Sequence, residues 1–304
     1  MKLGLLTAPF ADTKLNDVAD WAASAGYAML EVACWPRTGG EARRYAGTSH
    51  IDVAKLSKGE AAHIVGELAS RGITVSALGY YPNNLHPDRE HRTQVNDHLK
   101  KVIKAAALMG VPVVNTFIGG DQNLSVKGNW PAFLKVWPKL VDYAEGLGVK
   151  VAIENCPMIF SKDEWPGGHN IAYSPAVWRE MFAACGDNLG LNLDPSHLVW
   201  QMIDIERVVH EFGPRLFHAH GKDLEIDRDG LYEHGILSLG MGWQVPRLPG
   251  LGQVPWGRFV SALYKAGYDY VLCVEHEDRQ FEGNDELVKR GFEIARNTLA
   301  PLLA

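Results

Sequence analysis

The sequence predicts an α/β chain that closes into a (β/α)8 barrel, the TIM barrel. Eight short apolar segments alternate with stretches of helical spacing along the 304 residues, which is the pattern of a parallel sheet covered by helices. Eight such units in a chain somewhat longer than the usual barrel of about 250 residues favour a closed barrel over an open sheet. An open dinucleotide-binding sheet would carry a GxGxxG turn after its first strand, where Thr7-Ala8-Pro9 stands instead.

Apolar runs and their breakers place the elements in order. The first five helical stretches each end at a glycine, which is typical of a helix C-terminus, and Ser174-Pro175 is typical of a helix start. We expect strands over residues 3–7, 28–33, 73–78, 111–117, 149–154, 189–194, 215–220 and 270–275. We expect helices over residues 15–25, 58–70, 89–109, 131–147, 175–186, 203–212, 255–266 and 285–299. The longest insertion, residues 221–254, is rich in glycine and shows no helical period, and residues 1–304 are expected to form one domain.

Composition and charge exclude several classes of protein. The formal net charge of −6 argues against a nucleic-acid partner, whose phosphates favour basic faces. The four cysteines show no CxxC spacing, so a disulfide framework or a thiolate metal site is not expected. Asp12 and Lys14 interrupt the apolar N-terminus, which therefore resembles neither a signal peptide nor a membrane span. We expect a cytoplasmic protein without a membrane partner, and a homo-oligomer is compatible with the sequence.

Four of the expected strands end in a side chain that can bind a metal ion. In a (β/α)8 barrel the carboxyl ends of the strands form the active-site face, so these four side chains are expected to converge. The candidate ligands are Glu154 in VAIENCP, Asp194 in LNLDPSH, His220 in LFHAHGKD and Glu275 in VLCVEHED. If they face the interior, the residue before each of them faces the helices. All four of those residues are apolar: Ile153, Leu193, Ala219 and Val274.

Three carboxylates and one imidazole offer mostly oxygen ligands. This set suits one divalent cation, with Mn²⁺ as our first choice and Mg²⁺ or Co²⁺ as alternatives, better than a structural zinc ion. Taken singly, a strand-end acid is more often a cap or an ion-pair partner, but four at matched positions are hard to explain in that way. His218 would also point inward and competes with His220 as the ligand. His220 lies nearer the mouth, so we favour it and place His218 behind it.

Other side chains near the expected mouth suit a bound substrate. His197 follows Asp194 by three residues and would reach the substrate, unless it is a simple loop histidine. Lys222 follows the seventh strand and would stabilise a developing oxyanion, although a solvated lysine is equally consistent with the sequence. Aromatic rings on these loops suit the apolar faces of a sugar, with loop packing as the alternative. The candidates for substrate contact are Trp35, Phe117, Trp165 and Trp256.

These motifs together resemble the sugar phosphate isomerase/epimerase superfamily with a xylose isomerase-like TIM barrel. That group includes ketose 3-epimerases, inosose dehydratases and endonuclease-IV-type repair enzymes. The matching pieces are IENCP, DPSH, HxHxKD, GLGQVPW and VEHED, and the resemblance covers essentially the whole chain. The resemblance implies that a divalent metal is held by the four strand-end ligands. It also implies that His197 contacts the substrate and that Glu154 and Glu275 are the acid/base groups.

The sequence departs from the ketose 3-epimerases at three positions. Phe160 stands where those enzymes carry a glutamate, Ile226 where they carry an arginine, and Pro255 where the GLGQVPW segment usually has an aspartate. These departures argue against simple ketose 3-epimerisation. The extra metal-binding histidines and the basic groove that an endonuclease requires are not evident either.

The resulting expectation is a metal-dependent isomerase or epimerase that acts on a keto-sugar or glycoside through a metal-stabilised enediolate. The alternative is a lyase that performs β-elimination on a 3-keto-glycoside, or a dehydratase of a keto-polyol. A sugar-binding barrel without catalytic activity is a third possibility, but it would not need four converging ligands. A non-phosphorylated substrate is expected because acidic residues that would repel a phosphate dianion crowd the last two loops: Asp223, Glu225, Asp227, Asp229, Glu277, Asp278 and Glu282.

Overall fold

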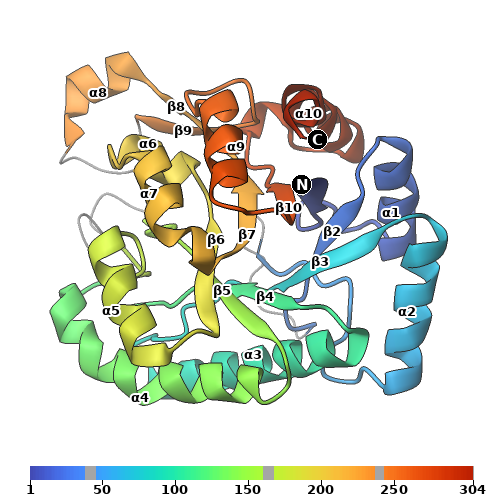
Figure 1. Ribbon diagram of the computed structural model, residues 1–304, viewed down its shortest axis with the longest axis horizontal. Coiled ribbons are helices and arrows are strands. Elements are labelled where there is room, and N and C mark those ends of the chain that lie inside the picture. The colour runs from blue at the N-terminus through green and yellow to red at the C-terminus, as the bar shows by residue number, and fades with distance from the viewer. Residues whose placement is uncertain (38–45, 160–167, 237–242, 304) are drawn as a thin grey trace.

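Eight parallel strands pair all the way round to close a barrel, in the order β1-β10-β7-β6-β5-β4-β3-β2, with helices on its outside (Figure 1). The computed structural model describes residues 1–37, 46–159, 168–236 and 243–303. The ring closes where β1 pairs with β10, with Lys2 opposite Val271. The predicted (β/α)8 barrel is therefore confirmed.

The barrel strands and the surrounding helices alternate along the chain. The barrel strands are β1 (Lys2–Leu6), β2 (Met29–Ala33), β3 (Thr74–Gly79), β4 (Val113–Thr116), β5 (Lys150–Glu154), β6 (Leu189–Leu193), β7 (Leu216–Gly221) and β10 (Val271–Val274). The main helices are α1 (Leu15–Ser24), α2 (Lys58–Ser70), α3 (Arg89–Met109), α4 (Val126–Glu145), α5 (Pro175–Cys185), α7 (Ile205–Phe212), α9 (Trp256–Lys265) and α10 (Asp285–Leu299). Short 3₁₀ turns cover Gly213–Arg215, Arg279–Phe281 and Ala300–Leu302.

Each of these strands ends within one residue of its expected position, whereas two short helices and a hairpin were not expected. Helix α6 (Ser196–Trp200) follows β6 directly. The insertion after β7, expected to lack helical structure, contains helix α8 (Arg228–His234) between the antiparallel strands β8 (Asp223–Ile226) and β9 (Gln244–Arg247). Short helices of this kind carry too few turns for a hydrophobic period to be visible in the sequence.

Helix α4 begins earlier than the sequence predicts. The expected start was Pro131, and proline is common in the first turn of a helix. The helix instead starts at Val126, because the Ser125 hydroxyl caps it by accepting a hydrogen bond from the Gly128 amide at 3.1 Å. Pro131 and Pro138 both lie inside the helix. A capping serine therefore marks this helix start better than the proline does.

Successive side chains along each strand face alternately the surrounding helices and the inside of the barrel. The main apolar cluster lies between barrel and helices and includes Ile153, Leu193, Ala219 and Val274, as expected from the strand pattern. Inside the barrel, smaller apolar clusters include Ala152 and Cys273. Polar side chains share that interior, all of them buried: Glu31, Ser76, Asn192, His218 and His220.

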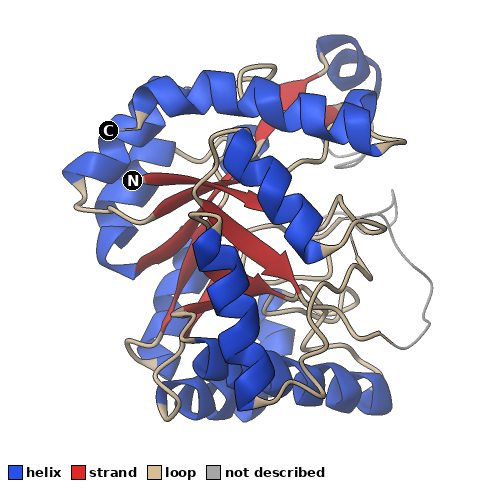
Figure 2. Cartoon of the chain, turned by 90° about the vertical axis from the view of Figure 1, so that its right-hand side faces the viewer, coloured by secondary structure: helices blue, strands red, loops and turns tan. Residues whose placement is uncertain are grey.

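Viewed from the side, the barrel strands point toward one face, where many of the longer loops gather (Figure 2). This is the carboxyl-end face, on which (β/α)8 barrels build their sites. No helix of the described residues combines the length and apolar content that crossing a bilayer requires.

Candidate metal centre at the strand ends

The structure brings the four predicted ligands together at the carboxyl ends of β5, β6, β7 and β10. Nδ1 of His220 lies 3.0 Å from Oε2 of Glu275 and 3.9 Å from Oε2 of Glu154. The ligand atoms of these three residues all lie within 4.8 Å of one another, so a single ion can reach them. Asp194 comes directly after β6. It contacts His197 and Lys222, which in turn contact Glu154 and Glu275, as described below.

A buried carboxylate that the sequence analysis missed holds the ring of His220. Oε2 of Glu31, in the middle of β2, lies 2.8 Å from Nε2 of His220. The hydroxyl of Tyr81 donates a hydrogen bond to the other oxygen of Glu31. Because Glu31 engages Nε2, the ring presents Nδ1 to the strand ends, an arrangement common around metal-bound histidines. The available signal was a charged residue inside the apolar run MLEVA, at a position that faces the barrel interior.

Three of the candidate ligand atoms are buried and lack a well-directed hydrogen bond. They are Oδ2 of Asp194, Nδ1 of His220 and Oε2 of Glu275. Adjacent ligands of an octahedral cation with bonds of about 2.1 Å lie about 3 Å apart, which matches the 3.0 Å between His220 and Glu275. Buried polar atoms without partners are expensive unless an ion or another group satisfies them. The donor set therefore fits a divalent cation that prefers oxygen ligands.

Asp194 is fixed by its own backbone surroundings. The Asn155 side chain accepts a hydrogen bond from the Asp194 amide at 2.8 Å and donates one to its carbonyl at 2.9 Å. Oδ1 of Asp194 accepts a hydrogen bond from the amide of Ser196 at 2.8 Å, which caps the start of helix α6. The remaining oxygen, Oδ2, is left pointing into the cluster.

His197 lies on helix α6 and is buried, so it is not a loop histidine. Its Nε2 is 3.1 Å from Oδ2 of Asp194 and 3.4 Å from Oε1 of Glu154. Trp200 donates a hydrogen bond to its Nδ1 at 3.5 Å. The short helix, which the sequence analysis did not predict, thus places His197 against two of the candidate ligands.

Lys222 is also buried and lies among the carboxylates. Its ammonium nitrogen is 2.9 Å from Oε2 of Glu275, 3.0 Å from Oδ2 of Asp194 and 3.2 Å from Oε2 of Glu277. It is not a solvated lysine. Its charge offsets part of the repulsion among the acids.

Burial and neighbouring charges shift the pKa values of the carboxylates in different directions. Burial raises the pKa of Glu154, and the charge of Glu275 raises it further. Burial also opposes ionisation of Asp194 and Glu275, but the ammonium of Lys222 outweighs it, lowering the pKa of Asp194 and bringing that of Glu275 to about 2. Burial likewise opposes the charged form of His220, yet the carboxylates of Glu31 and Glu275 raise its pKa well above the usual value. Glu154 is therefore the carboxyl group best suited to exchange a proton.

His218 lies one layer deeper than His220. Its Nδ1 and Nε2 hydrogen-bond with Asn192 Oδ1 at 2.9 Å and with Ser76 Oγ at 3.1 Å. Burial lowers the pKa of His218 to about 3. Both ring nitrogens are engaged, so this histidine is placed to support the site from below. Glu31, His218 and His220 also lie close enough together to hold an ion. However, both ring nitrogens of His218 and Nε2 of His220 already make hydrogen bonds.

The four aromatic residues predicted to contact the substrate differ in their surroundings. Phe117 is buried against the ring of Tyr81, and half-buried Trp35 packs edge-on against Tyr80. Trp165 lies outside the described residues. Trp256 is only 6% exposed, and its indole N–H donates to Oδ2 of Asp223 at 2.8 Å. The contacts of Trp256 make it a structural residue, which argues against the predicted role in substrate binding.

Asp223, the last residue of HxHxKD, is hydrogen-bonded to the GLGQVPW segment. Its carboxylate accepts hydrogen bonds from the amides of Gly250 and Val254 at 2.9 and 2.8 Å, besides that of Trp256. A side chain at Gly252 would collide with this carboxylate and would approach the Leu224 amide to 2.6 Å. Asp223 therefore ties the segment before α9 to the end of β7 and has a structural role.

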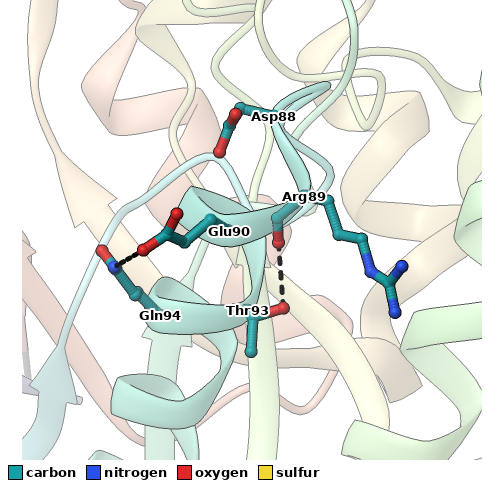
Figure 3. A pocket seen from close by; sticks show the side chains of 5 residues that line it. All are labelled: Asp88, Arg89, Glu90, Thr93 and Gln94. Carbon is teal, nitrogen blue, oxygen red and sulfur yellow. Dashed lines mark hydrogen bonds between the residues drawn. The ribbon is translucent and has the colours of Figure 1, made fainter.

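A separate surface hollow lies at the start of α3 (Figure 3). Its polar groups pair within the helix, where Gln94 donates to Glu90 at 3.4 Å and Thr93 donates to the Arg89 carbonyl at 2.9 Å. It includes none of the strand-end residues. We assign it no functional role.

The chain is thus a closed (β/α)8 barrel with a cluster of acids and histidines at its strand ends. The sequence pattern of the xylose isomerase-like TIM barrel matches residues 19–298, and the chain belongs to this family. The uncharacterized protein YfiH of Bacillus subtilis (strain 168) is 29% identical over 315 residues, which cover 91% of this chain and 93% of that protein.

Solved structures share the fold at low sequence identity. A D-psicose 3-epimerase from Clostridium cellulolyticum H10, solved with D-tagatose, superposes with a TM-score of 0.71 at 17% identity, covering 100% of both chains. The probable 3-DHS dehydratase AsbF of Bacillus anthracis gives 0.71 at 13% identity, covering 98% of this chain and 99% of that one. The IolI protein, solved with a zinc atom, gives 0.70 at 20% identity over 100% of both chains. These likenesses establish the fold, and several of the similar structures are those of enzymes.

Proposed function

We propose that this protein is a metal-dependent isomerase or epimerase that acts on a non-phosphorylated keto-sugar or glycoside. The observation that carries the proposal is the convergence of buried acids and an imidazole at the strand ends: Asp194, His220 and Glu275 beside Glu154. A sugar-binding protein without catalytic activity would have no use for this cluster. The proposed ligands are Glu154, Asp194, His220 and Glu275, and Mn²⁺ is the favoured ion.

When bound, the divalent cation would supply Lewis-acid polarisation of the substrate's carbonyl and an adjacent hydroxyl. Glu154 is the proposed base, since its raised pKa suits a group that takes the proton from the carbon next to the carbonyl. Glu275, once protonated, is the candidate for returning a proton to the enediolate. Delivery to the neighbouring carbon would give an isomer, and delivery to the opposite face of the carbon that lost its proton would give an epimer.

His197 and Lys222 supply the positive groups of the proposed mechanism. His197 lies 3.4 Å from Glu154, so it is placed to orient that carboxylate and to hydrogen-bond a substrate oxygen. Lys222 lies 3.9 Å from the same carboxylate, and its ammonium would stabilise charge that develops on the substrate.

Ion pairs around the mouth support a non-phosphorylated substrate. Arg247, on strand β9, pairs with Glu225 at 2.6 Å and with Asp278 at 3.5 Å. Lys222 is likewise paired with acids. A phosphate dianion would have to separate these pairs in a region that is rich in carboxylates, whereas a neutral sugar would not.

β-Elimination from a 3-keto-glycoside is the second candidate, because it begins with the same proton removal. Burial opposes the charged form of His197, but neighbouring acidic groups raise its pKa well above the usual value. A protonated imidazole beside the base is suited to protonate a departing oxygen. This is the feature of the site that favours elimination.

An NMR experiment in D₂O distinguishes the two reactions. The Mn²⁺-loaded protein would be incubated with free, phosphorylated and 3-keto sugars. An isomerase or epimerase incorporates deuterium into both substrate and product without loss of a group, whereas a lyase releases water or an aglycone and leaves an unsaturated keto-sugar. Turnover of a sugar phosphate in preference to free sugars would contradict the proposal.

A further inference from the structure

The ammonium of Lys222 lies against the same oxygens that we assign to the metal ion. It is 3.0 Å from Oδ2 of Asp194 and 2.9 Å from Oε2 of Glu275. The lysine side chain is only 4% exposed, so it enters the cluster from within the fold and not from solvent. In the structure, Lys222 therefore acts as the counter-ion of these carboxylates.

A divalent cation and this ammonium compete for the two oxygens. Two positive centres that share the same carboxylate oxygens would lie within a few ångströms of each other, and their repulsion in a buried site is strong. A metal ion that binds Asp194 and Glu275 must therefore displace the ammonium of Lys222. The affinity for the metal is lowered by the work of separating these ion pairs.

Glu277 offers the displaced lysine a partner. Its Oε2 already lies 3.2 Å from the ammonium, and its side chain is 27% exposed, against 12% for Glu275. Lys222 and Glu277 lie just beyond the ends of the paired strands β7 and β10, two residues after His220 and Glu275 respectively. A rotation of the long lysine stem toward the rim would therefore keep the ion pair with Glu277 while the ammonium leaves its other partners.

We propose that Lys222 is a built-in substitute for the metal ion, which it yields by turning to Glu277 when the cation binds. The inference rests on the proposed function for the location of the metal. It explains how a buried acidic cluster stays folded without a cation. It also means that the lysine ammonium is at the rim, facing the substrate, only in the metal-loaded protein.

Calorimetric titration with Mn²⁺ of the metal-free protein tests the competition. Lys222→Met removes the competing charge, so its dissociation constant should be at least about tenfold smaller than that of the wild type. The matched control is Lys150→Met, which removes an exposed lysine at the start of β5, at the opposite end of the barrel. The control should bind Mn²⁺ like the wild type. Equal or weaker binding by Lys222→Met would overturn the proposal.

A double-mutant cycle tests the role of Glu277. Glu277→Gln should weaken Mn²⁺ binding in the wild type, because the displaced lysine loses its partner. The same substitution in the Lys222→Met background should have much less effect. An equal effect in both backgrounds would show that Glu277 acts only through its own charge and would overturn this part of the proposal.

Thermal unfolding provides a second measurement if Lys222→Met is unstable without metal. Loss of the counter-ion should lower the Tm of the metal-free variant and enlarge the rise in Tm that Mn²⁺ produces. An unchanged rise would contradict the proposal. Absence of Mn²⁺ binding in both proteins would overturn the proposed function itself, whereas equal binding in both would overturn only the role of Lys222.

Discussion

The carboxylate of Glu31 lies 2.8 Å from Nε2 of His220, and the same ring turns Nδ1 toward Glu275 at 3.0 Å. If Nε2 carries the proton that Glu31 accepts, the lone pair on Nδ1 faces a carboxylate. That contact is unfavourable unless Nδ1 is also protonated or a cation lies between the two groups. In the proposed site, this pair would prepare His220 to bind a metal ion through Nδ1.

Removal of the Glu31 carboxylate should weaken metal binding without removing a ligand. Glu31→Ala should raise the dissociation constant for Mn²⁺ by about 10- to 100-fold, as is typical when the partner of a metal-bound histidine is lost. Glu31→Gln is the matched control, since its amide oxygen can still accept a hydrogen bond from Nε2, and a smaller loss is expected. Calorimetry gives both values, and circular dichroism checks the fold. Unchanged affinity in Glu31→Ala would show that His220 needs no such support.

Trp256 should matter for stability and not for substrate binding. Trp256→Phe removes the indole donor to Asp223 and should lower the free energy of unfolding by about 2 kcal/mol, since the lost hydrogen bond involves a charged acceptor. Denaturant unfolding measures this change. A large increase in KM at unchanged stability would instead support the stacking role that the sequence suggested.

Acid should destabilise the fold through its buried histidines. Nε2 of His98 donates a hydrogen bond to the Cys34 carbonyl at 2.9 Å, the ring packs edge-on against Tyr80, and burial lowers the pKa of His98. The unfolded chain then binds a proton near pH 6.5 that the folded chain does not, so stability falls as the pH drops below that value.

Denaturant unfolding of the metal-free protein at several pH values checks this expectation. Between pH 6 and pH 5, His98→Gln should reduce the pH dependence of the unfolding free energy by up to about 1.4 kcal/mol per pH unit. Exposed His63→Gln controls for the loss of an imidazole outside the core. An identical pH dependence in His98→Gln and the wild type would show that His98 has the same pKa in the folded and the unfolded chain.

The barrel could be predicted from the sequence because its strands are buried on both sides and end in clear breakers. Each expected strand end lies within one residue of the observed one, from Ala33 in β2 to Val274 in β10. The departures are local elements. Helix α6 is only five residues long, and the β8-β9 hairpin with α8 lies in a glycine-rich insertion where neither periodicity nor caps were evident.

The site was partly predictable for the same reason. A ligand at the end of an apolar strand stands out, and Glu154, Asp194, His220 and Glu275 do converge. Glu31 was missed because it lies inside a strand, where its polarity becomes meaningful only once the barrel places it opposite β7. The contacts of Lys222 with four acids depend on strand pairing, which a sequence pattern does not specify.

The metal content of purified protein tests the central claim most directly. Wild-type protein, stripped with a chelator, incubated with Mn²⁺ and desalted, should retain about one ion per chain by elemental analysis, because the four proposed strand-end ligands would form one site. Asp194→Ala should retain far less while keeping its fold, and Asp187→Ala, which removes an acid on the opposite face, should match the wild type. Full metal content in Asp194→Ala, or none in the wild type, would contradict the assignment of this cluster as a metal centre.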